Sequence, residues 1–324
     1  MTATPRLGIV LSTVTEGPPQ EFVDIGQQAE RHGWEAVLVN EGRGDALACA
    51  QAIACATSTL TVGTNIANIY FRHPFLAAGT LKTIADLAGG RLRVGFGMSH
   101  RGLLGSLGID MGDARSHLRD YVAAVKAGLA GEAGSGFLKH TPSRHAVPVY
   151  VAANTVESAA VAGEVGDGLM PFLTPRSFLP QLVAAARTSA ARHDRVLDEC
   201  PCILSIPTFV SDDAAAARSA ARYNLAFFAL LPNYRRQWRR AGYGAAMDAI
   251  RALGKGANRA AIAPLIPDAL VDDVCVFGTA AECRAQLEAF RAAGADMPVI
   301  AVSPVNEERL AATRKAIVAL APGA

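Results

Sequence analysis

The sequence predicts an α/β fold, a (β/α)8 barrel of the TIM type, from two regularities along the chain. Eight short apolar runs alternate with stretches of helical spacing, and the runs are continuous rather than alternating in polarity. Continuous runs are typical of parallel strands that are covered on their outer face by helices. The chain has 324 residues, of which 51% are hydrophobic, so it can fill a closed barrel without disulfides or metals. An open, doubly wound sheet is the alternative fold.

Each expected strand is a short run of apolar and small residues, and the runs are 7–11, 36–39, 60–63, 92–96, 149–152, 168–172, 203–210 and 298–302. The expected helices lie between or after these strands and cover 18–32, 45–57, 74–88, 114–130, 155–164, 176–195, 279–294 and 305–319. Because helices return the chain between strands, neighbouring strands are expected to run in the same direction, with the helices outside.

Residues 211–277 do not fit this repeat, and they are predicted to form a helical insertion after the seventh strand. Ser211 and Asp212 can cap a helix start, while Pro232 and Gly242 interrupt the helical pattern. An insertion here would lie over the carboxyl end of the barrel as a lid or a pocket wall. A structural buttress on the outside of the barrel is the alternative.

Two further features concern the surface and the assembly of the barrel. Residues 131–146 are rich in Gly and Ser and are predicted to form a surface loop. The helices at 45–57 and 74–88 are rich in alanine and poor in charge, which predicts cover on more than one face and hence a homodimer. Ordinary packing against the sheet is the alternative. The whole chain, 1–324, is expected to be one barrel domain.

Composition narrows the class of protein. The net charge is only +2, from 31 basic and 29 acidic residues, which gives no electrostatic basis for binding nucleic acid or membranes. The chain begins without a signal-peptide pattern, and no run reaches the ~18 apolar residues of a membrane span, so we expect a cytoplasmic protein. Reduced, buried thiols are expected at all six cysteines: Cys49, Cys55, Cys200, Cys202, Cys275 and Cys283.

Polar residues follow the first five strands, at the end of a barrel where active sites form. They are Ser12 and Thr13; Asn40, Glu41 and Arg43; Thr64, Asn65 and Asn68; Ser99 and His100; and Asn154 and Thr155. This set lacks the clustered histidines and carboxylates of a catalytic metal site, so no metal is expected. A dinucleotide fingerprint is also disfavoured, because after Gly95 and Gly97 it requires glycine where His100 stands.

Glu41 and His100 are the two obvious proton carriers at these strand ends. Burial would raise the pKa of the carboxyl group and lower that of the imidazole, bringing both nearer neutrality. Each could equally be a hydrogen-bonded structural residue. Asn154 and Thr155 precede a helix whose exposed amides could hold a phosphate, or Thr155 could be a plain N-cap. An anionic group could also meet one of four arginines, for which surface or structural pairing is the alternative: Arg43, Arg72, Arg101 and Arg176.

The stretch VGTNIANIYFRHPFLAAGTLKTIADLAGGRLRVGFGMSH, residues 62–100, closely resembles the bacterial luciferase-like superfamily. The resemblance is greatest to the branch that uses the deazaflavin coenzyme F420. It extends over most of the chain, with supporting segments at 33–47, 148–170 and 276–302.

This resemblance implies a (β/α)8 barrel, often dimeric, with the cofactor ring at the carboxyl end of the strands. It further implies a non-proline cis peptide bond between Asn65 and Ile66, in a bulge that lies behind the ring. The implied cofactor-binding residues are Asn40; Asn65, Ile66 and Ala67 of the bulge; Gly97, Met98 and Ser99 beside the ring; and Ala152, Ala153, Asn154 and Thr155 of a phosphate-binding turn.

Some F420-dependent relatives have aspartate and histidine after the second strand and glutamate after the fourth. This chain has Asn40 and Glu41 at the first place and His100 at the second, which argues against a sugar-phosphate dehydrogenase. The resemblance implies hydride transfer between C5 of F420 and a C=C, C=N or C=O carbon of a small organic substrate, with Glu41 or His100 exchanging the proton. An FMN-dependent monooxygenase and a non-catalytic flavin- or deazaflavin-binding barrel are the alternatives, and the substrate stays open.

Overall fold

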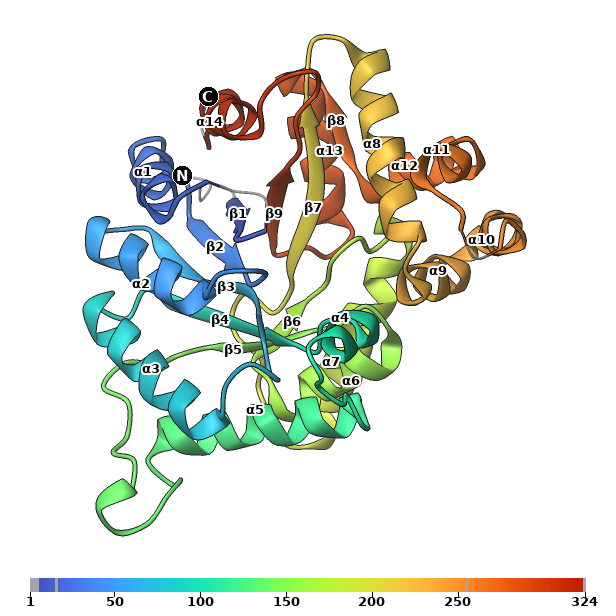
Figure 1. The fold of residues 1–324 in the computed structure, drawn as a ribbon. Coiled ribbons are helices and arrows are strands. Elements are labelled where there is room, and N and C mark those ends of the chain that lie inside the picture. Colours follow the sequence, from blue (N-terminus) through green and yellow to red (C-terminus); the bar gives the residue numbers. More distant parts are fainter. Residues whose placement is uncertain (1–5, 15–16, 255, 323–324) are drawn as a thin grey trace.

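The computed structural model describes residues 6–14, 17–254 and 256–322, and its centre is a curled parallel sheet (Figure 1). Nine strands lie in the order β6-β5-β4-β3-β2-β1-β9-β7-β8. Their bounds are β1 (Gly8–Ser12), β2 (Ala36–Asn40), β3 (Thr61–Asn68), β4 (Leu92–Gly97), β5 (Val149–Ala152), β6 (Gly168–Met170), β7 (Ile203–Val210), β8 (Val276–Gly278) and β9 (Met297–Val302). Two isolated parallel bridges, Leu169 to Cys202 and Phe172 to Ser205, connect β6 with β7. The predicted α/β architecture and all eight predicted strands are therefore present.

Strand β8 was not predicted, and it differs from the others in how it pairs. Its three residues pair only with the last three residues of β7. Thr208 in β7 pairs with both Val276 and Val302, so β8 lies along the edge of β7 that faces away from β9. It continues the edge that the two bridges from β6 begin.

The helices lie outside the sheet in Figure 1, in the order that the sequence predicts. Their bounds are α1 (Pro19–Arg31), α2 (Ala46–Ala56), α3 (Pro74–Leu87), α4 (Arg101–Ser106), α5 (Ala114–Ala130), α6 (Val156–Val165), α7 (Leu179–Arg192), α8 (Ala214–Ala229), α9 (Pro232–Trp238), α10 (Gly244–Ala252), α11 (Arg259–Ile262), α12 (Asp268–Val274), α13 (Ala280–Ala292) and α14 (Arg309–Ala319). The short helix α4 was not predicted.

Local side chains explain where several helices begin. Asp45 accepts hydrogen bonds from two amides at the start of α2, and Asp113 does the same for α5. Thr279 and Glu282 form a reciprocal capping box on α13. Gly131 ends α5 in the left-handed conformation with φ 81°, which glycine adopts without a steric penalty.

Residues 211–277 form helices α8 to α12 and the first two residues of strand β8, gathered on one side of the sheet (yellow to orange in Figure 1). These helices have their own apolar core, in which Leu225 and Trp238 are fully buried. The indole nitrogen of Trp238 donates to the carbonyl oxygen of Leu173 at 2.9 Å. Since Leu173 follows β6, this contact attaches α9 to the carboxyl end of the sheet.

The expectation that all six cysteine thiols are buried is wrong for two of them. Four cysteines are buried, but Cys55 is exposed and Cys49 is half-buried, because the part of α2 that carries them faces away from the sheet. All six thiols are free. Among the described helices, none has the length and apolar character needed to cross a bilayer. The homodimer, the cytoplasmic location and the single domain stay predictions.

Candidate active site

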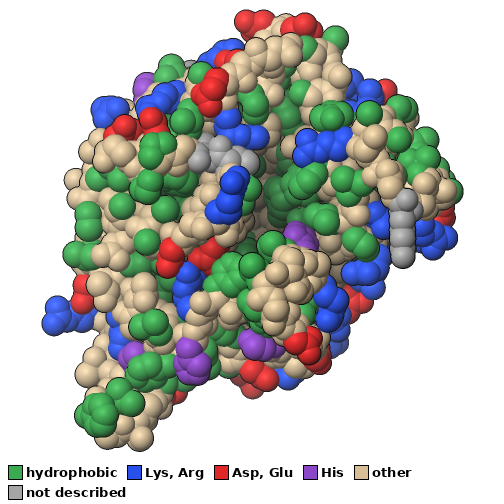
Figure 2. Space-filling view, viewed as in Figure 1, with side chains coloured by type: hydrophobic (Ala, Val, Ile, Leu, Met, Phe, Trp, Pro, Cys, Tyr) green, Lys and Arg blue, Asp and Glu red, His purple; other side chains and the backbone are tan. Residues whose placement is uncertain are grey.

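The carboxyl ends of the strands surround a hollow on the face shown in Figure 2, and hydrophobic side chains line it. Several residues at or near these strand ends are half-buried, whereas most of the preceding strand residues are buried. They are Ser12, Asn40, Ile66, Ala152 and Ala301 in the strands, and Phe172 just after β6. Neighbouring strands bring these positions together, since Ser12 pairs with Asn40, and Asn68 pairs with Gly97.

A bulge in β3 forms one side of this region. The register between β3 and β4 shifts between Thr64 and Ala67, and the peptide bond between Asn65 and Ile66 is cis. The cis bond that the resemblance implied is therefore confirmed. The side-chain amide of Asn40 donates to the carbonyl oxygen of Asn65 at 3.2 Å, which ties the end of β2 to the bulge.

Two glycines of β4 make room for the bulge. A Cβ on Gly97 would lie 2.8 Å from Cδ1 of Ile66 and 3.0 Å from Cβ of Ala152. A Cβ on Gly95 would lie 3.0 Å from Cγ2 of Ile66. The Ile66 side chain therefore packs across β4 because both residues lack a side chain. Beyond Gly97 the chain turns at Ser99, which has φ 59°.

We predict that Gly97→Ala weakens cofactor binding by at least about tenfold, because the added methyl group displaces Ile66 from the bulge, at an overpacking cost of about 1–3 kcal/mol. The dissociation constant for F420, the cofactor that the resemblance implies, and the free energy of unfolding measure the two effects. Gly102→Ala in α4 is the matched control, since a Cβ there has nothing within 4 Å. Equal affinities in wild type and Gly97→Ala would contradict the packing argument.

The turn after β5 is ordered by its own hydrogen bonds. The Asn154 side chain accepts from the amide of Phe172 at 2.9 Å, which joins the turns after β5 and β6. Thr155 caps α6 in a reciprocal arrangement with Ser158, as the plain N-cap alternative expected. Ala152 and Ala153 precede this turn, and Met98 lies half-buried against the main core.

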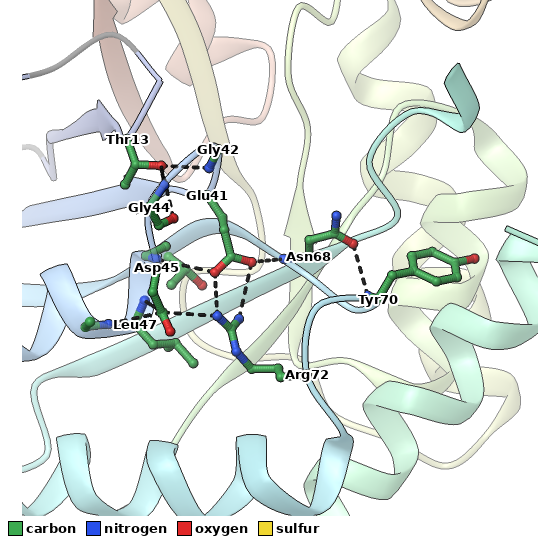
Figure 3. A network of polar contacts seen from close by, with 12 residues as sticks. Thr13, Glu41, Gly42, Gly44, Asp45, Leu47, Asn68, Tyr70 and Arg72 are labelled. Atoms are coloured by element: carbon green, nitrogen blue, oxygen red, sulfur yellow. Dashed lines mark hydrogen bonds and ion pairs between the residues drawn. The ribbon is translucent and has the colours of Figure 1, made fainter. Parts of the chain in front are cut away.

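Glu41 lies at the centre of a polar network beside the bulge (Figure 3). Its side chain is only 2% exposed. Two arginine nitrogens of Arg72 donate to the carboxylate, at 2.5 and 3.2 Å. The backbone amides of Asn68 and Ala46 donate to it at 2.7 and 3.3 Å. Both carboxylate oxygens therefore accept hydrogen bonds within the protein. This structural role competes with the predicted role of Glu41 in exchanging a proton.

The same network connects three segments of the site. Arg72 also pairs with Asp45 at 3.0 Å, so one guanidinium joins the chain before α3 to the start of α2. Burial alone would lower the pKa of Arg72, but Glu41 and Asp45 raise it above its ordinary value. The backbone amide of Glu41 donates to the carbonyl oxygen of Ile66 at 3.0 Å, on the peptide bond that follows the cis bond. Glu41 thus holds the bulge through both its backbone and its side chain.

His100 lies at the start of α4 in a different environment. Its imidazole is half-buried and makes no hydrogen bond to any residue in the described part of the chain. Burial lowers the pKa of the imidazole below its ordinary value, so the neutral form predominates at pH 7. The His100 ring lies beside the Tyr234 ring of α9, with 5.8 Å between the ring centroids.

Sequence reasoning missed three aromatic residues here: Tyr234, which lies beside His100, and Phe172 and Phe228, which pack against Tyr234. They come from α9, from the chain after β6 and from α8. Nothing in their local sequence distinguishes them from ordinary apolar core residues, and only the fold of 211–277 brings Phe228 and Tyr234 to the barrel mouth.

Two cavities lie elsewhere and contain none of the predicted catalytic or cofactor-binding residues. One of about 390 Å³ is lined by Arg176, Arg218 and Asp272, among others, near β8. The other, of about 420 Å³, is lined by Arg187 and Asp296, among others. The strand-end chemistry, rather than cavity size, therefore identifies the candidate site. Across the described ranges, no group of three or more His, Cys, Asp or Glu residues is placed to hold a metal ion.

Comparison with known proteins agrees with this architecture. A curated relative from Methanolobus tindarius, 5,10-methylenetetrahydromethanopterin reductase, is 24% identical over 91% of this chain and 94% of its own. A Mycobacterium tuberculosis protein, named provisionally as a coenzyme F420-dependent oxidoreductase, is 27% identical over 95% of this chain and 98% of its own.

Solved structures give the same fold. The F420-dependent tetrahydromethanopterin reductase of Methanopyrus kandleri superposes with a TM-score of 0.79 at 19% identity, covering 98% of each chain. The oxygenating constituent of 3,6-diketocamphane monooxygenase from Pseudomonas putida, solved with FMN, gives 0.70 at 14% identity, covering 99% of this chain and 97% of its own. The profile of the luciferase-like monooxygenases matches residues 6–297, nearly the whole barrel including the bulge and the turn after β5. The chain therefore belongs to the luciferase-like monooxygenase family.

Proposed function

We propose that the protein is an F420-dependent oxidoreductase that transfers hydride between C5 of the deazaflavin and an electrophilic C=C, C=N or C=O carbon of a small organic substrate. The observation that carries the proposal is the cradle formed by the cis bulge and the two glycines of β4. The names of both curated relatives agree with it, since one is a reductase and the other carries F420 in its name.

The residues of the cradle fit a flat ring with a polar edge. Ile66 and Ala152 are half-buried apolar side chains on either side of Gly97, and they offer a smooth surface. The side-chain nitrogen of Asn65 is buried and has no hydrogen-bond partner among the described residues. Ring carbonyl groups would satisfy such a donor. We therefore assign Asn40, Asn65, Ile66, Ala67, Gly97, Met98 and Ser99 to cofactor binding.

The phosphate end of the cofactor is proposed to bind at the turn after β5, with Ala153, Asn154 and Thr155. Glu157 occupies the first turn of α6 there and pairs with Arg240 at 2.7 Å. A hydrogen bond from its own backbone amide and the Arg240 guanidinium lower the pKa of Glu157 to about 2. Its negative charge therefore competes with a phosphate for both the helix start and the arginine.

We predict that Glu157→Gln tightens F420 binding by about two- to fivefold, because it removes this competing charge and releases Arg240. Titration of F420 fluorescence measures the affinity. Glu164→Gln, near the other end of α6, is the matched control and should leave the affinity unchanged. Weaker binding by Glu157→Gln would place the phosphate elsewhere.

His100 is the better candidate for the proton carrier. When bound, the reduced cofactor supplies the hydride, so the protein has to supply or accept only one proton. The His100 imidazole has no described hydrogen-bond partner and a pKa lowered by burial, so it can exchange a proton with a bound substrate. The Glu41 carboxylate is already bound by four donors. We therefore propose that Glu41 supports the bulge and that His100 exchanges the proton with the substrate.

The helices of 211–277 are proposed to form a wall of the substrate pocket. Tyr234 of α9 contacts His100, and Gln237 and Trp238 of the same helix donate to the chain after β6. These contacts support the proposal, because a segment beside His100 can exclude water from the reaction.

An FMN-dependent monooxygenase is the second candidate, and it is favoured by the family to which the chain belongs and by the FMN-bound structure that shares its fold. Anaerobic assays separate the two. Reduced F420 is mixed with neutral ketones, enones and imines, and the return of the oxidised cofactor's absorbance is followed. We expect turnover without oxygen. Turnover only with reduced FMN and oxygen would contradict the proposal, and binding of either cofactor without turnover would favour a non-catalytic barrel.

A further inference from the structure

Four aromatic rings from four segments, including that of His100, pack together at the mouth of the site. His100 lies 5.8 Å from Tyr234, and Tyr234 lies 5.1 Å from Phe228 and 6.2 Å from Phe172, between ring centroids. Phe172 and Phe228 meet edge to face at 5.3 Å. We call these four residues the aromatic wall. Phe172, Phe228 and His100 are half-buried, so the wall faces the open end of the barrel rather than the closed core.

The polar groups of the aromatic wall differ from those of neighbouring residues in their hydrogen bonding. Beside Tyr234, the indole of Trp238 donates to the carbonyl oxygen of Leu173, and Nε2 of Gln237 donates to the same carbonyl oxygen at 3.2 Å. The hydroxyl group of Tyr234 and the imidazole of His100 have no such partners among the described residues, and they are not hydrogen-bonded to each other. Tyr234 is nevertheless only 5% exposed. The Tyr234 hydroxyl oxygen is not fully buried, so the small exposed part of this residue includes it and leaves it accessible to a molecule bound at the mouth.

We infer that the Tyr234 hydroxyl donates a hydrogen bond to the acceptor atom of a neutral, flat, largely apolar substrate, with His100 as the second polar contact. This inference rests on the proposed function and names the substrate class of the same site. An aromatic wall accommodates flat apolar molecules edge to face. No member of the wall carries a fixed charge, so an ionic substrate would lose its hydration here without an opposite charge to replace it.

The donor also has a chemical role. A carbonyl oxygen can accept two hydrogen bonds, and donors at that oxygen stabilise the negative charge that develops as hydride reaches the electrophilic carbon. Burial raises the pKa of Tyr234 well above its ordinary value, so the phenol stays protonated and able to donate.

The experiment uses 4-(dimethylamino)cinnamaldehyde, a neutral, flat probe whose absorption band moves to longer wavelength when its carbonyl group accepts a hydrogen bond. Purified protein is titrated with the probe, alone and after saturation with oxidised F420, which cannot donate hydride. We expect binding and a red shift in the wild type. Tyr234→Phe keeps the ring, and it should lose most of the shift and about fivefold in affinity, the effect of one neutral hydrogen bond.

Two further variants keep the result interpretable. Tyr223→Phe on α8 removes an exposed hydroxyl outside the wall, and it should behave as wild type. Phe228→Leu should weaken binding with the band position unchanged, since it removes wall area but no donor. Thermal unfolding checks that each variant is folded.

An unshifted band in the wild type, or an unchanged band and affinity in Tyr234→Phe, would overturn the inference. Tighter binding of the charged 4-(dimethylamino)cinnamate than of the aldehyde would overturn the substrate class. The proposed function fails independently if F420 does not bind while the probe still reports a hydrogen bond from Tyr234.

Discussion

Replacing Arg72 by alanine is expected to destabilise the protein by about 3–5 kcal/mol and to abolish cofactor binding. The reason is that Glu41, only 2% exposed, would keep its charge in a buried position without its main partner. The bulge would lose its support at the same time, since Glu41 holds the amide of Asn68 and, through its backbone, the carbonyl oxygen of Ile66. Urea unfolding gives the free energy, and F420 titration gives the loss of binding.

The control is Arg43→Ala, because Arg43 follows the same strand but is exposed and, among the described residues, donates only to the carbonyl oxygen of Val14. Its stability should stay within about 0.5 kcal/mol of wild type. The double variant Glu41→Gln with Arg72→Gln should be less destabilised than the sum of the two single changes, since the two residues interact directly. A wild-type unfolding curve for Arg72→Ala would show that the network does not support the site.

Replacing His100 by alanine is expected to slow the hydride-transfer step by about 10²-fold in single-turnover experiments, because the reaction then lacks a positioned proton carrier. Protein stability and F420 affinity should change little, since the imidazole makes no hydrogen bond to the described residues. Glu41→Gln should have the opposite profile, with losses in stability and cofactor affinity that exceed its effect on the chemical step.

The pH dependence of the rate shows whether His100 accepts or donates the proton. Burial lowers the pKa of His100, so the kinetic inflection should lie below the ordinary value of about 6.5. In the direction in which His100 accepts a proton, the rate should rise as the pH rises through this inflection. In the direction in which it donates a proton, the rate should fall. An inflection that persists unchanged in His100→Ala would assign the proton to another group.

Much of the barrel is readable from the sequence because each barrel strand is a continuous apolar run with a helix after it. This pattern does not predict strand β8, since its three residues become a strand only by pairing with the end of β7. Nor does it predict helix α4, because its six residues include two glycines and no apolar repeat. In both cases tertiary contacts, rather than local pattern, decide the structure.

The sequence predicts only those parts of the site that lie at the ends of strands. The glycines of β4 and the turn after β5 follow from the strand ends, and the bulge follows from the family resemblance. The pairing of Glu41 with Arg72 crosses 31 residues, and no local pattern reveals it. Tyr234 belongs to helix α9, whose position over the barrel depends on long-range contacts such as that of Trp238 with Leu173. Glu41 and His100 could therefore be named from sequence as candidates, but the arginine that binds Glu41 could not.

The central claim is that the cradle of Ile66 and Gly97 holds a deazaflavin, and parallel titrations of the purified protein with F420 and FMN test it most directly. Cofactor fluorescence and the thermal unfolding temperature are followed at matched concentrations. We expect saturable F420 binding, a rise in the unfolding temperature, and an affinity at least about tenfold higher than that for FMN. Saturable binding of FMN with no response to F420 would contradict the account.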